Sequence, residues 1–241
     1  MSDSYSSIAE NYDYIFPLNP LQIEFLVNKL PNEKGLSLLD LGCGTGSLAA
    51  ALTEKDYTVV GIDNDPKMIE VAQSKHKGKN PVFFVEDMRK LQRSFKAESF
   101  DAIYCFGNSL VHLGNPDEIE NLFQVVRSLL KPGGKFFGQI INYRRIFDKM
   151  VTGLPTIDNE HISFERSYNF SGPGDPLYFK TRLLTKKNHK IVENTEVLYP
   201  LLPEEALFFL ENAGFYDYDL FGAFNGDSLL SDSYSFIFAA H

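Results

Sequence analysis

The chain has 241 residues and a formal net charge of −9, with 44% hydrophobic and 23% charged residues. This length suffices to bury a substantial core, and the composition is ordinary for a globular protein. No run approaches the roughly 18 apolar residues that a membrane span requires, and the N-terminus has no basic stretch followed by an apolar run. The acidic charge disfavours a nucleic-acid partner, which would require a basic patch. We therefore expect a cytoplasmic protein with no nucleic-acid and no membrane partner.

The first 150 residues alternate between apolar runs of strand character and segments of helical periodicity. The clearest helix is expected at 116–130, because Asn115 can cap it, Pro116 suits its first position, and apolar residues recur at helical spacing. Such alternation implies a parallel sheet that is covered on both faces. The expected helices are 21–30, 47–54, 66–76 and 116–130, and the expected strands are 38–41, 57–61, 82–85, 99–106 and 135–141.

The pattern changes after about residue 150. Residues 161–170 alternate apolar and polar side chains with a period of two, which is typical of a half-buried strand. The remaining expected elements are strands at 177–185, 191–199, 215–221 and 234–239 and a helix at 203–213. We predict an antiparallel β insertion at 151–199, set into an α/β domain formed by 1–150 and 200–241.

Residues 38–46 read Leu-Leu-Asp-Leu-Gly-Cys-Gly-Thr-Gly, an apolar strand that runs into three glycines. Glycines at alternate positions tolerate positive φ and let a ligand lie against bare backbone. A dinucleotide site would require Gly-x-Gly-x-x-Gly, but the third place of that pattern falls on Ser47, whereas the third glycine is Gly46. The turn therefore predicts a nucleotide-like ligand other than NAD.

An acidic residue follows the next strand, in a place suited to a ribose. Asp63 lies 21 residues after Gly42, where a carboxylate can accept two hydrogen bonds from a ribose diol. Asp65 directly precedes Pro66 and is expected to cap the following helix. This assignment leaves Asp63 for the ribose.

The Asp-x-Gly-x-Gly-x-Gly pattern at 40–46 resembles motif I of the class I S-adenosylmethionine-dependent methyltransferases. The resemblance implies a Rossmann-like fold with a mostly parallel seven-stranded sheet, S-adenosyl-L-methionine as cofactor and S-adenosyl-L-homocysteine as product. In that family an aspartate after the third strand reads the adenine amino group and an apolar neighbour flanks the ring, places that Asp87 and Met88 match. The cofactor-binding residues that the resemblance implies are Tyr12, Asp40, Gly42, Cys43, Gly44, Gly46, Asp63, Asn64, Met68, Asp87, Met88, Phe106 and Gly107.

Further segments of the sequence resemble one branch of this family in particular. The Cys-Phe-Gly-Asn-Ser-Leu run at 105–110, the Lys-Pro-Gly-Gly run at 131–134, and the pair Asn142-Tyr143 are similar to glycine and sarcosine N-methyltransferases and their bacterial relatives. Residues 5–14 resemble a segment of small-molecule methyltransferases in which a tyrosine closes over the cofactor. The resemblance implies methyl transfer to a small-molecule acceptor, at an amine nitrogen.

Three other functions remain open. An O-methyltransferase on a small metabolite has the same cofactor motifs. Nucleic-acid or protein methylation is disfavoured by the acidic charge, and base-modifying enzymes of this fold often carry Asn/Asp-Pro-Pro-Tyr where residues 106–109 read Phe-Gly-Asn-Ser. A non-catalytic cofactor-binding protein is disfavoured because Asp40, Asp63 and Asp87 are all present.

The insertion is the expected determinant of substrate specificity. A parallel sheet binds its ligand outside the carboxyl ends of its strands, so an insertion over that edge would act as a substrate lid. Arg166 shares a strand face with Phe164 and Tyr168, and its guanidinium could grip a carboxylate or form an internal salt bridge with Glu193 or Glu196. The substrate-binding candidates are Tyr14, Arg144, Arg166 and Tyr168, and Tyr143 and Arg145 are rival contacts.

The catalytic candidates are Asn108, His112 and Tyr143. A free amine needs no strong general base, whereas a hydroxyl or phenol would need one, for which His112 and His161 are available. Asn108 could orient the acceptor or satisfy the loop backbone.

The two cysteines, Cys43 and Cys105, lie in turns at the ends of expected strands. We interpret them as reduced, partly buried thiols, because the cytosol is reducing and no zinc spacing is present. No metal site is therefore expected. The open edge of the insertion sheet makes a homodimer possible.

Overall fold

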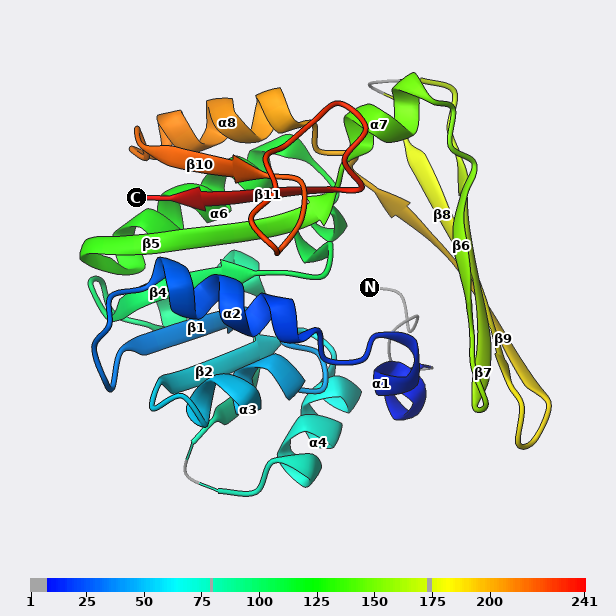
Figure 1. The fold of residues 1–241 in the computed structure, drawn as a ribbon, viewed down its shortest axis with the longest axis horizontal. Coiled ribbons are helices and arrows are strands. Elements are labelled where there is room, and N and C mark those ends of the chain that lie inside the picture. The colour runs from blue at the N-terminus through cyan, green and yellow to red at the C-terminus, as the bar shows by residue number, and fades with distance from the viewer. Residues whose placement is uncertain (1–7, 79, 173–174) are drawn as a thin grey trace.

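The computed structural model describes residues 8–78, 80–172 and 175–241 and contains two separate sheets (Figure 1). The larger sheet has seven strands: β1 (Ser37–Leu41), β2 (Thr58–Asp63), β3 (Val82–Val85), β4 (Phe100–Cys105), β5 (Leu130–Ile141), β10 (Tyr218–Phe221) and β11 (Ser235–Ala240). Their order is β10-β11-β5-β4-β1-β2-β3, and only β11 runs antiparallel to its neighbours β5 and β10. The predicted Rossmann-like fold with a mostly parallel sheet of seven strands is confirmed.

Helices cover both faces of this sheet (Figure 1). The longest is α6, in which the Asn115 side chain accepts a hydrogen bond from the backbone N–H of Glu118 at 2.9 Å and Pro116 stands at the first position. Its apolar stripe is buried against the sheet, as the helical spacing predicts. The helices of the main domain are α1 (Tyr12–Ile15), α2 (Pro20–Lys29), α3 (Ser47–Thr53), α4 (Pro66–Lys75), α5 (Leu91–Ser94), α6 (Pro116–Leu129), α7 (Tyr143–Asp148) and α8 (Pro203–Asn212), with single turns η1 (Ala9–Asn11), η2 (Met88–Lys90) and η3 (Ser109–Leu113).

The second sheet is formed by the insertion and is antiparallel throughout. Its four strands, here called the lid sheet, are β6 (Gly153–Asp158), β7 (Ile162–Asn169), β8 (Leu177–Thr185) and β9 (Lys190–Leu198), in that order. The lid sheet stands opposite the end of the main sheet at which the parallel strands finish, with α1 between them (Figure 1). It therefore faces the edge where parallel sheets bind ligands.

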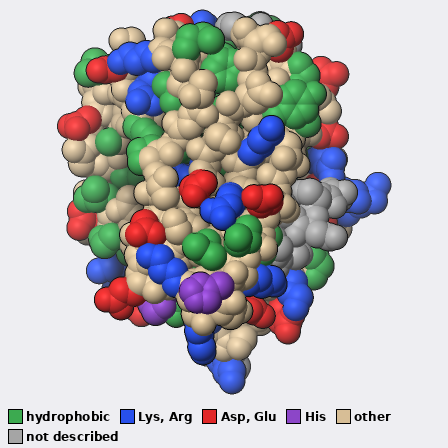
Figure 2. Space-filling view, turned by 90° about the vertical axis from the view of Figure 1, so that its right-hand side faces the viewer, with side chains coloured by type: hydrophobic (Ala, Val, Ile, Leu, Met, Phe, Trp, Pro, Cys, Tyr) green, Lys and Arg blue, Asp and Glu red, His purple; other side chains and the backbone are tan. Residues whose placement is uncertain are grey.

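The two faces of the lid sheet differ in chemistry. On the inner face, Phe164 and Leu183 are buried in a cluster with Ile15 of α1 and Met68 of α4. The opposite face carries charged side chains, among them Arg182, which pairs with Glu165 and Glu193 at 3.3 and 3.4 Å. Figure 2 looks onto this side of the molecule and shows basic and acidic side chains interspersed over it. The period of two therefore separates a face toward the main domain from a face toward water.

Several elements differ from the sequence prediction. Strand β6 and helix α7 were not predicted, so the insertion has four strands where three were expected. Helix α6 ends at Leu129, and β5 begins at Leu130 and includes the Pro-Gly-Gly turn. Its pairing with β4 shifts register between Phe100 and Ala102, which accommodates the turn inside the strand. Among the described residues, no helix is both long and apolar enough to cross a membrane.

Candidate functional site

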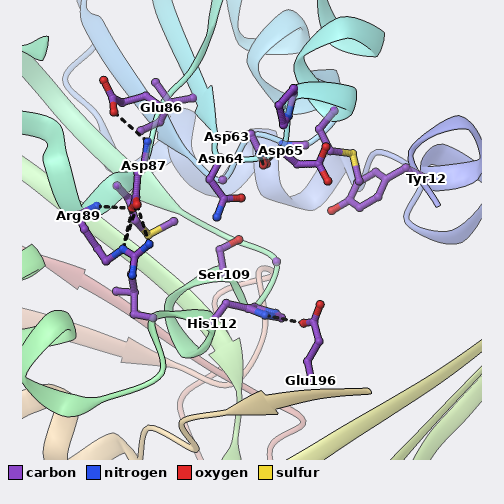
Figure 3. Close-up of a pocket in the computed structure, with 18 of the residues that line it drawn as sticks. Tyr12, Asp63, Asn64, Asp65, Glu86, Asp87, Arg89, Ser109, His112 and Glu196 are labelled. Atoms are coloured by element: carbon purple, nitrogen blue, oxygen red, sulfur yellow. Dashed lines mark hydrogen bonds and ion pairs between the residues drawn. The ribbon is translucent and has the colours of Figure 1, made fainter. Parts of the chain in front are cut away.

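A cavity of about 480 Å³ lies at the carboxyl edge of the main sheet, beneath the lid sheet (Figure 3). Its walls come from the turn after β1, the ends of β2 and β3, the segment around η3, the N-terminal helix α1, and β9 of the lid sheet. The predicted site residues on this wall are Tyr12, Gly42, Gly44, Asp63, Asn64, Met68, Asp87, Met88, Gly107 and His112. The structure thus brings together residues from five segments that the sequence separates.

The three glycines of the turn have two different roles. Gly42 and Gly44 line the cavity with φ of +74° and +53°, and a Cβ on Gly42 would come within 2.6 Å of the Ser109 hydroxyl. Gly46 lies behind the wall, where a Cβ would be 2.4 Å from the Phe83 ring. The first two glycines therefore expose bare backbone to a ligand, whereas the third allows the turn to pack on β3.

Asp63 holds the glycine turn and faces the cavity (Figure 3). One carboxylate oxygen accepts a hydrogen bond from the Gly44 N–H at 3.0 Å, and the other accepts from the Asp65 N–H at 2.9 Å. Burial raises the pKa of Asp63, while these two hydrogen bonds oppose the rise. Each carboxylate oxygen has two acceptor positions, so both can still receive a ribose hydroxyl. Asp65 caps α4 as predicted, accepting from the Lys67 N–H at 2.8 Å.

The end of β3 supplies a second carboxylate to the wall. Asp87 accepts hydrogen bonds from the Arg89 guanidinium at 2.7–3.1 Å, and Arg89 also pairs with Glu118 at 3.4 Å. The guanidinium lowers the pKa of Asp87, so this carboxylate is ionised at neutral pH. Met88 lines the cavity beside it. The adenine contact of Asp87 stays a prediction. Adenine would have to share the Asp87 carboxylate with Arg89, which donates to both of its oxygens.

The N-terminal helix closes one side of the cavity. The Tyr12 ring lies over the glycine turn, 3.1 Å from where a Cβ on Gly44 would stand. Asp13 fastens α1 in place, because its carboxylate accepts a hydrogen bond from the Thr45 hydroxyl at 2.5 Å and pairs with Lys75. This position agrees with a tyrosine that covers the cofactor. Residues 5–7 of the predicted covering segment lie outside the described residues.

Four predicted cofactor residues, Asp40, Cys43, Gly46 and Phe106, are placed behind the wall of the cavity rather than on it. Asp40 is 4% exposed, and burial raises its pKa to about 8. Both cysteine thiols are free, as predicted, and burial raises the pKa of each. Phe106 packs on Tyr104 and Phe224. These residues support the turn from behind.

Asn108 and Tyr143 connect the main domain to the lid sheet. The Asn108 carbonyl oxygen accepts from the Ile141 N–H, and its amide donates to the Tyr143 hydroxyl, both at 3.0 Å. Tyr143 is fully buried, and its ring meets that of Tyr168 edge-on with centroids 6.4 Å apart. Neither residue lines the cavity. The amide of Asn108 thus serves the loop backbone, one of the two roles that the sequence left open.

His112 lies on the cavity wall and is paired with Glu196 of β9. Its Nδ1 atom is 3.0 Å from a carboxylate oxygen of Glu196. Sequence reasoning considered Glu196 only as a partner for Arg166, because strand register across the lid cannot be read from one sequence. Ser109, which lies against Gly42, was also missed and has no sequence signal of its own.

The four substrate candidates fall in different places. Arg144 pairs with Glu204, and Tyr14 is 44% exposed with its ring stacked on His161. Arg166 lies on the inner face of the lid sheet, as does Tyr168, and donates to the Pro155 carbonyl at 2.8 Å. Its Nε atom is buried and has no hydrogen-bond partner among the described residues. Glu193 and Glu196, the predicted alternatives for a salt bridge, pair with Arg182 and His112.

The residues of the cavity fit an adenosyl cofactor. A ribose needs a carboxylate at the end of β2, and Asp63 provides one beside the bare backbone of Gly44. A Cβ on Gly42 would stand 2.6 Å from the Ser109 hydroxyl and one on Gly44 3.1 Å from the Tyr12 ring, so glycine at both positions lets these side chains pack on the turn at the cavity. Among the described residues, no group of three or more His, Cys, Asp and Glu is placed to hold a metal ion.

Comparisons with known proteins agree with this geometry. Residues 38–134 match the family described as a methyltransferase domain. YqeM of Bacillus subtilis (strain 168), which is named a methyltransferase, is 35% identical over 163 residues, or 66% of this chain and 64% of that protein. The ubiquinone biosynthesis O-methyltransferase of Actinobacillus pleuropneumoniae is 36% identical over 131 residues, or 52% of this chain and 54% of that enzyme. The matches thus span between about half and two thirds of these relatives.

A solved structure covers nearly the whole chain. It is that of an S-adenosylmethionine-dependent methyltransferase from Clostridium acetobutylicum, with a TM-score of 0.79, 19% identity and coverage of 98% of each chain. This likeness extends the shared fold over the lid sheet as well as the main sheet. The narrower resemblance to glycine and sarcosine N-methyltransferases stays a prediction.

Proposed function

Because the chain carries the domain and the fold of the class I S-adenosylmethionine-dependent methyltransferases, we propose that it transfers a methyl group to a small-molecule acceptor. The observation that carries this proposal is the cavity in which bare backbone at Gly42 and Gly44 adjoins the Asp63 carboxylate beneath the lid sheet. It combines a place for an adenosyl group with an enclosed space beside it. A small acceptor suits a cavity of about 480 Å³ that has the lid sheet as one wall.

S-adenosylmethionine, when bound, supplies a methyl group on a positively charged sulfur. The chain's own residues bind and enclose it. Asp63 would accept the ribose hydroxyls, and Tyr12 covers the turn from the side of α1. The lid sheet forms one wall of the cavity, and a wall that shields a bound ligand from water strengthens the electrostatic interactions around it. Holding donor and acceptor in line is the main catalytic contribution that such a site makes.

We propose an amine nitrogen as the methyl acceptor. The support is the resemblance of the segments around Asn108 and Asn142-Tyr143 to N-methyltransferases of small amines. A neutral amine is nucleophilic without a strong base, so the site needs only to orient it.

A hydroxyl oxygen is the second candidate, and one observation favours it. His112 on the cavity wall is held by Glu196 at 3.0 Å, an arrangement suited to removing a proton. A relative at 36% identity is named for O-methylation in ubiquinone biosynthesis. A phenol or alcohol would use such a base.

The experiment is an acceptor screen with methyl-labelled S-adenosylmethionine and the whole protein. The panel contains small amines, amino acids and amino sugars beside phenols and hydroxy acids, and mass spectrometry identifies the methylated atom. We expect methyl transfer to members of one chemical group. Asp63→Asn, which should weaken cofactor binding, is expected to lower this transfer. Labelling of added RNA or protein, with none of the small molecules, would contradict the proposal.

A further inference from the structure

The contact between His112 and Glu196 joins the main domain to the lid sheet at the cavity itself. His112 belongs to η3, which follows β4, and Glu196 belongs to β9. The imidazole Nδ1 is 3.0 Å from the carboxylate, and the two side chains are 25% and 11% exposed. Figure 3 shows them on the side of the cavity opposite Asp63 and Tyr12. Both residues line the cavity.

Backbone contacts fix this pair in register. The Tyr199 N–H, just beyond β9, donates to the Val111 carbonyl of η3 at 2.9 Å. Val111 is fully buried, so η3 is anchored on the main domain. Glu196 lies directly across from Phe179 of β8, which in turn faces Tyr168 of β7, so all three point to the inner face. Glu196 is therefore brought to His112 by the docking of the lid sheet.

This geometry has a chemical consequence for the imidazole. A carboxylate accepts hydrogen bonds only, so Nδ1 must carry the proton that it shares with Glu196. Nε2 is then the basic atom of the neutral ring. The charged and titratable groups that line the same cavity are Tyr12, Asp63, Asp65, Glu86, Asp87 and Arg89.

We infer that Glu196 is a positioning residue that makes His112 the base of the reaction, an inference that rests on the proposed function with a hydroxyl as the methyl acceptor. The acceptor's nucleophilic atom forms a bond to the methyl carbon with its lone pair, and the carbon–sulfur bond breaks with its electron pair going to sulfur. The proton of the nucleophilic atom passes to Nε2 of His112. Glu196 stabilises the resulting imidazolium, which later releases the proton to solvent.

Glu196, which positions the base, belongs to β9 of the lid sheet. The docked lid therefore completes the pair of His112 and Glu196 at the cavity. An acceptor that binds while the lid is displaced would meet an imidazole without its carboxylate. The reaction is thus confined to the closed arrangement.

The first test reads the tautomer of His112 by nitrogen-15 NMR of the whole protein with S-adenosylhomocysteine added. We expect a protonated Nδ1 and an unprotonated Nε2 in the neutral ring, and loss of this preference in Glu196→Ala. The matched control is His241, whose Nε2 lies 3.0 Å from Asp217, so it should show the opposite tautomer and respond only to Asp217→Ala. A His112 protonated at Nε2, or a tautomer unchanged in Glu196→Ala, would overturn the inference.

The second test separates catalysis from structure, using the acceptor found in the screen. General bases contribute about 10²–10⁴-fold, so His112→Ala should lower kcat by that factor while KM for S-adenosylmethionine stays within about threefold. Glu196→Ala should lower kcat less, Glu196→Gln less again, and the double variant no further than His112→Ala alone, because Glu196 acts through the imidazole. Added imidazole should restore part of the rate in His112→Ala.

These tests distinguish a failure of this inference from a failure of the proposed function. Wild-type protein that binds no S-adenosylhomocysteine would contradict the proposed function, and the tautomer measurement would still decide whether the pair exists. Normal binding and turnover with a His112→Ala kcat within about threefold of wild type would overturn the base and leave the methyltransferase intact. Multiplicative effects in the double variant would show that Glu196 does not act through His112.

Discussion

The two sides of the cavity are built in different ways. On the side of the main sheet, the wall consists of backbone at Gly42 and Gly44 and of a carboxylate, Asp63, that is held by backbone N–H groups. On the lid side, the wall consists of side chains such as Glu196, whose place depends on the register of three antiparallel strands. The first side, here called the socket, suits a ligand that does not vary. The second can change its chemistry by single substitutions without disturbing the turn.

The difference separates the two tasks of the molecule. Backbone atoms cannot be altered by substitution, which suits a cofactor that is the same for every member of a fold. Side chains on the inner face of the lid sheet can be exchanged without altering the backbone pairing of its strands. We therefore expect cofactor binding and acceptor choice to respond to different substitutions.

The largest effect is expected at the turn, from Gly46→Ala. Gly46 has φ of +79°, and a Cβ there would stand 2.4 Å from the Phe83 ring. The left-handed backbone and the clash together should lower the free energy of unfolding by about 2–5 kcal/mol. Gly35→Ala is the matched control, because Gly35 has φ of +73° with no heavy atom within 4 Å of its Cβ position. Equal losses for the two variants, measured by urea unfolding, would contradict the packing role.

The lid sheet should respond to Phe164→Ala. Phe164 is 2% exposed and packs in a cluster with Ile15 and Met68, so its truncation leaves a cavity at the lid's contact with α1. We expect a loss of about 2–4 kcal/mol in lid docking, seen as faster amide exchange in β7 and α1. Val197→Ala, at a position that is 55% exposed, is the control and should leave exchange nearly unchanged. Faster exchange spread evenly over the main sheet would show that the two regions unfold together.

Cofactor affinity should depend on Asp63 and not on the lid. In Asp63→Asn, one amide nitrogen would face a backbone N–H of Gly44 or Asp65, so a donor would oppose a donor. We expect the affinity for S-adenosylhomocysteine, measured by calorimetry, to fall about 10–100-fold. Asp56→Asn, which alters a 60% exposed carboxylate paired with Lys34, is the control. Unchanged affinity in Asp63→Asn would show that the carboxylate does not meet the ribose.

A further effect, gradual over several pH units, is expected in the pH dependence of stability. An unfolded aspartate loses its proton near pH 4, whereas burial raises the pKa of Asp40 in the folded chain to about 8. Between these values the folded state binds more protons, so this group's contribution lowers the free energy of unfolding as pH rises, by at most about 1.4 kcal/mol per unit. Asp40→Asn should remove that slope between pH 5 and 8. Parallel curves for wild type and variant, from urea unfolding at each pH, would contradict the shift.

The socket could be predicted from the sequence, and most of the lid contacts could not. The glycine turn, Asp63 and the cap Asp65 follow one another within a short stretch, and parallel strands bring their ends to one edge. The inner face that carries Phe164, Arg166 and Tyr168 was also readable, because alternation has a period of two.

The features that could not be predicted from the sequence depend mainly on contacts between distant segments. Glu196 meets His112 only because the lid sheet docks on η3, where the Tyr199 N–H donates to the Val111 carbonyl, and no local pattern in the sequence sets that docking. Strand β6 was not predicted because its residues lack a clear alternation of apolar and polar side chains. The third glycine was predicted to bind cofactor, yet it packs on Phe83, because one motif serves both ligand approach and packing.

The most direct test of the account is calorimetric titration of the whole protein with S-adenosylhomocysteine, run beside NAD on the same sample. We expect a dissociation constant on the order of micromolar for S-adenosylhomocysteine and no heat of binding with NAD. Folded protein that binds no S-adenosylhomocysteine, or that binds NAD as well, would contradict the claim that this turn is a methyl-donor site.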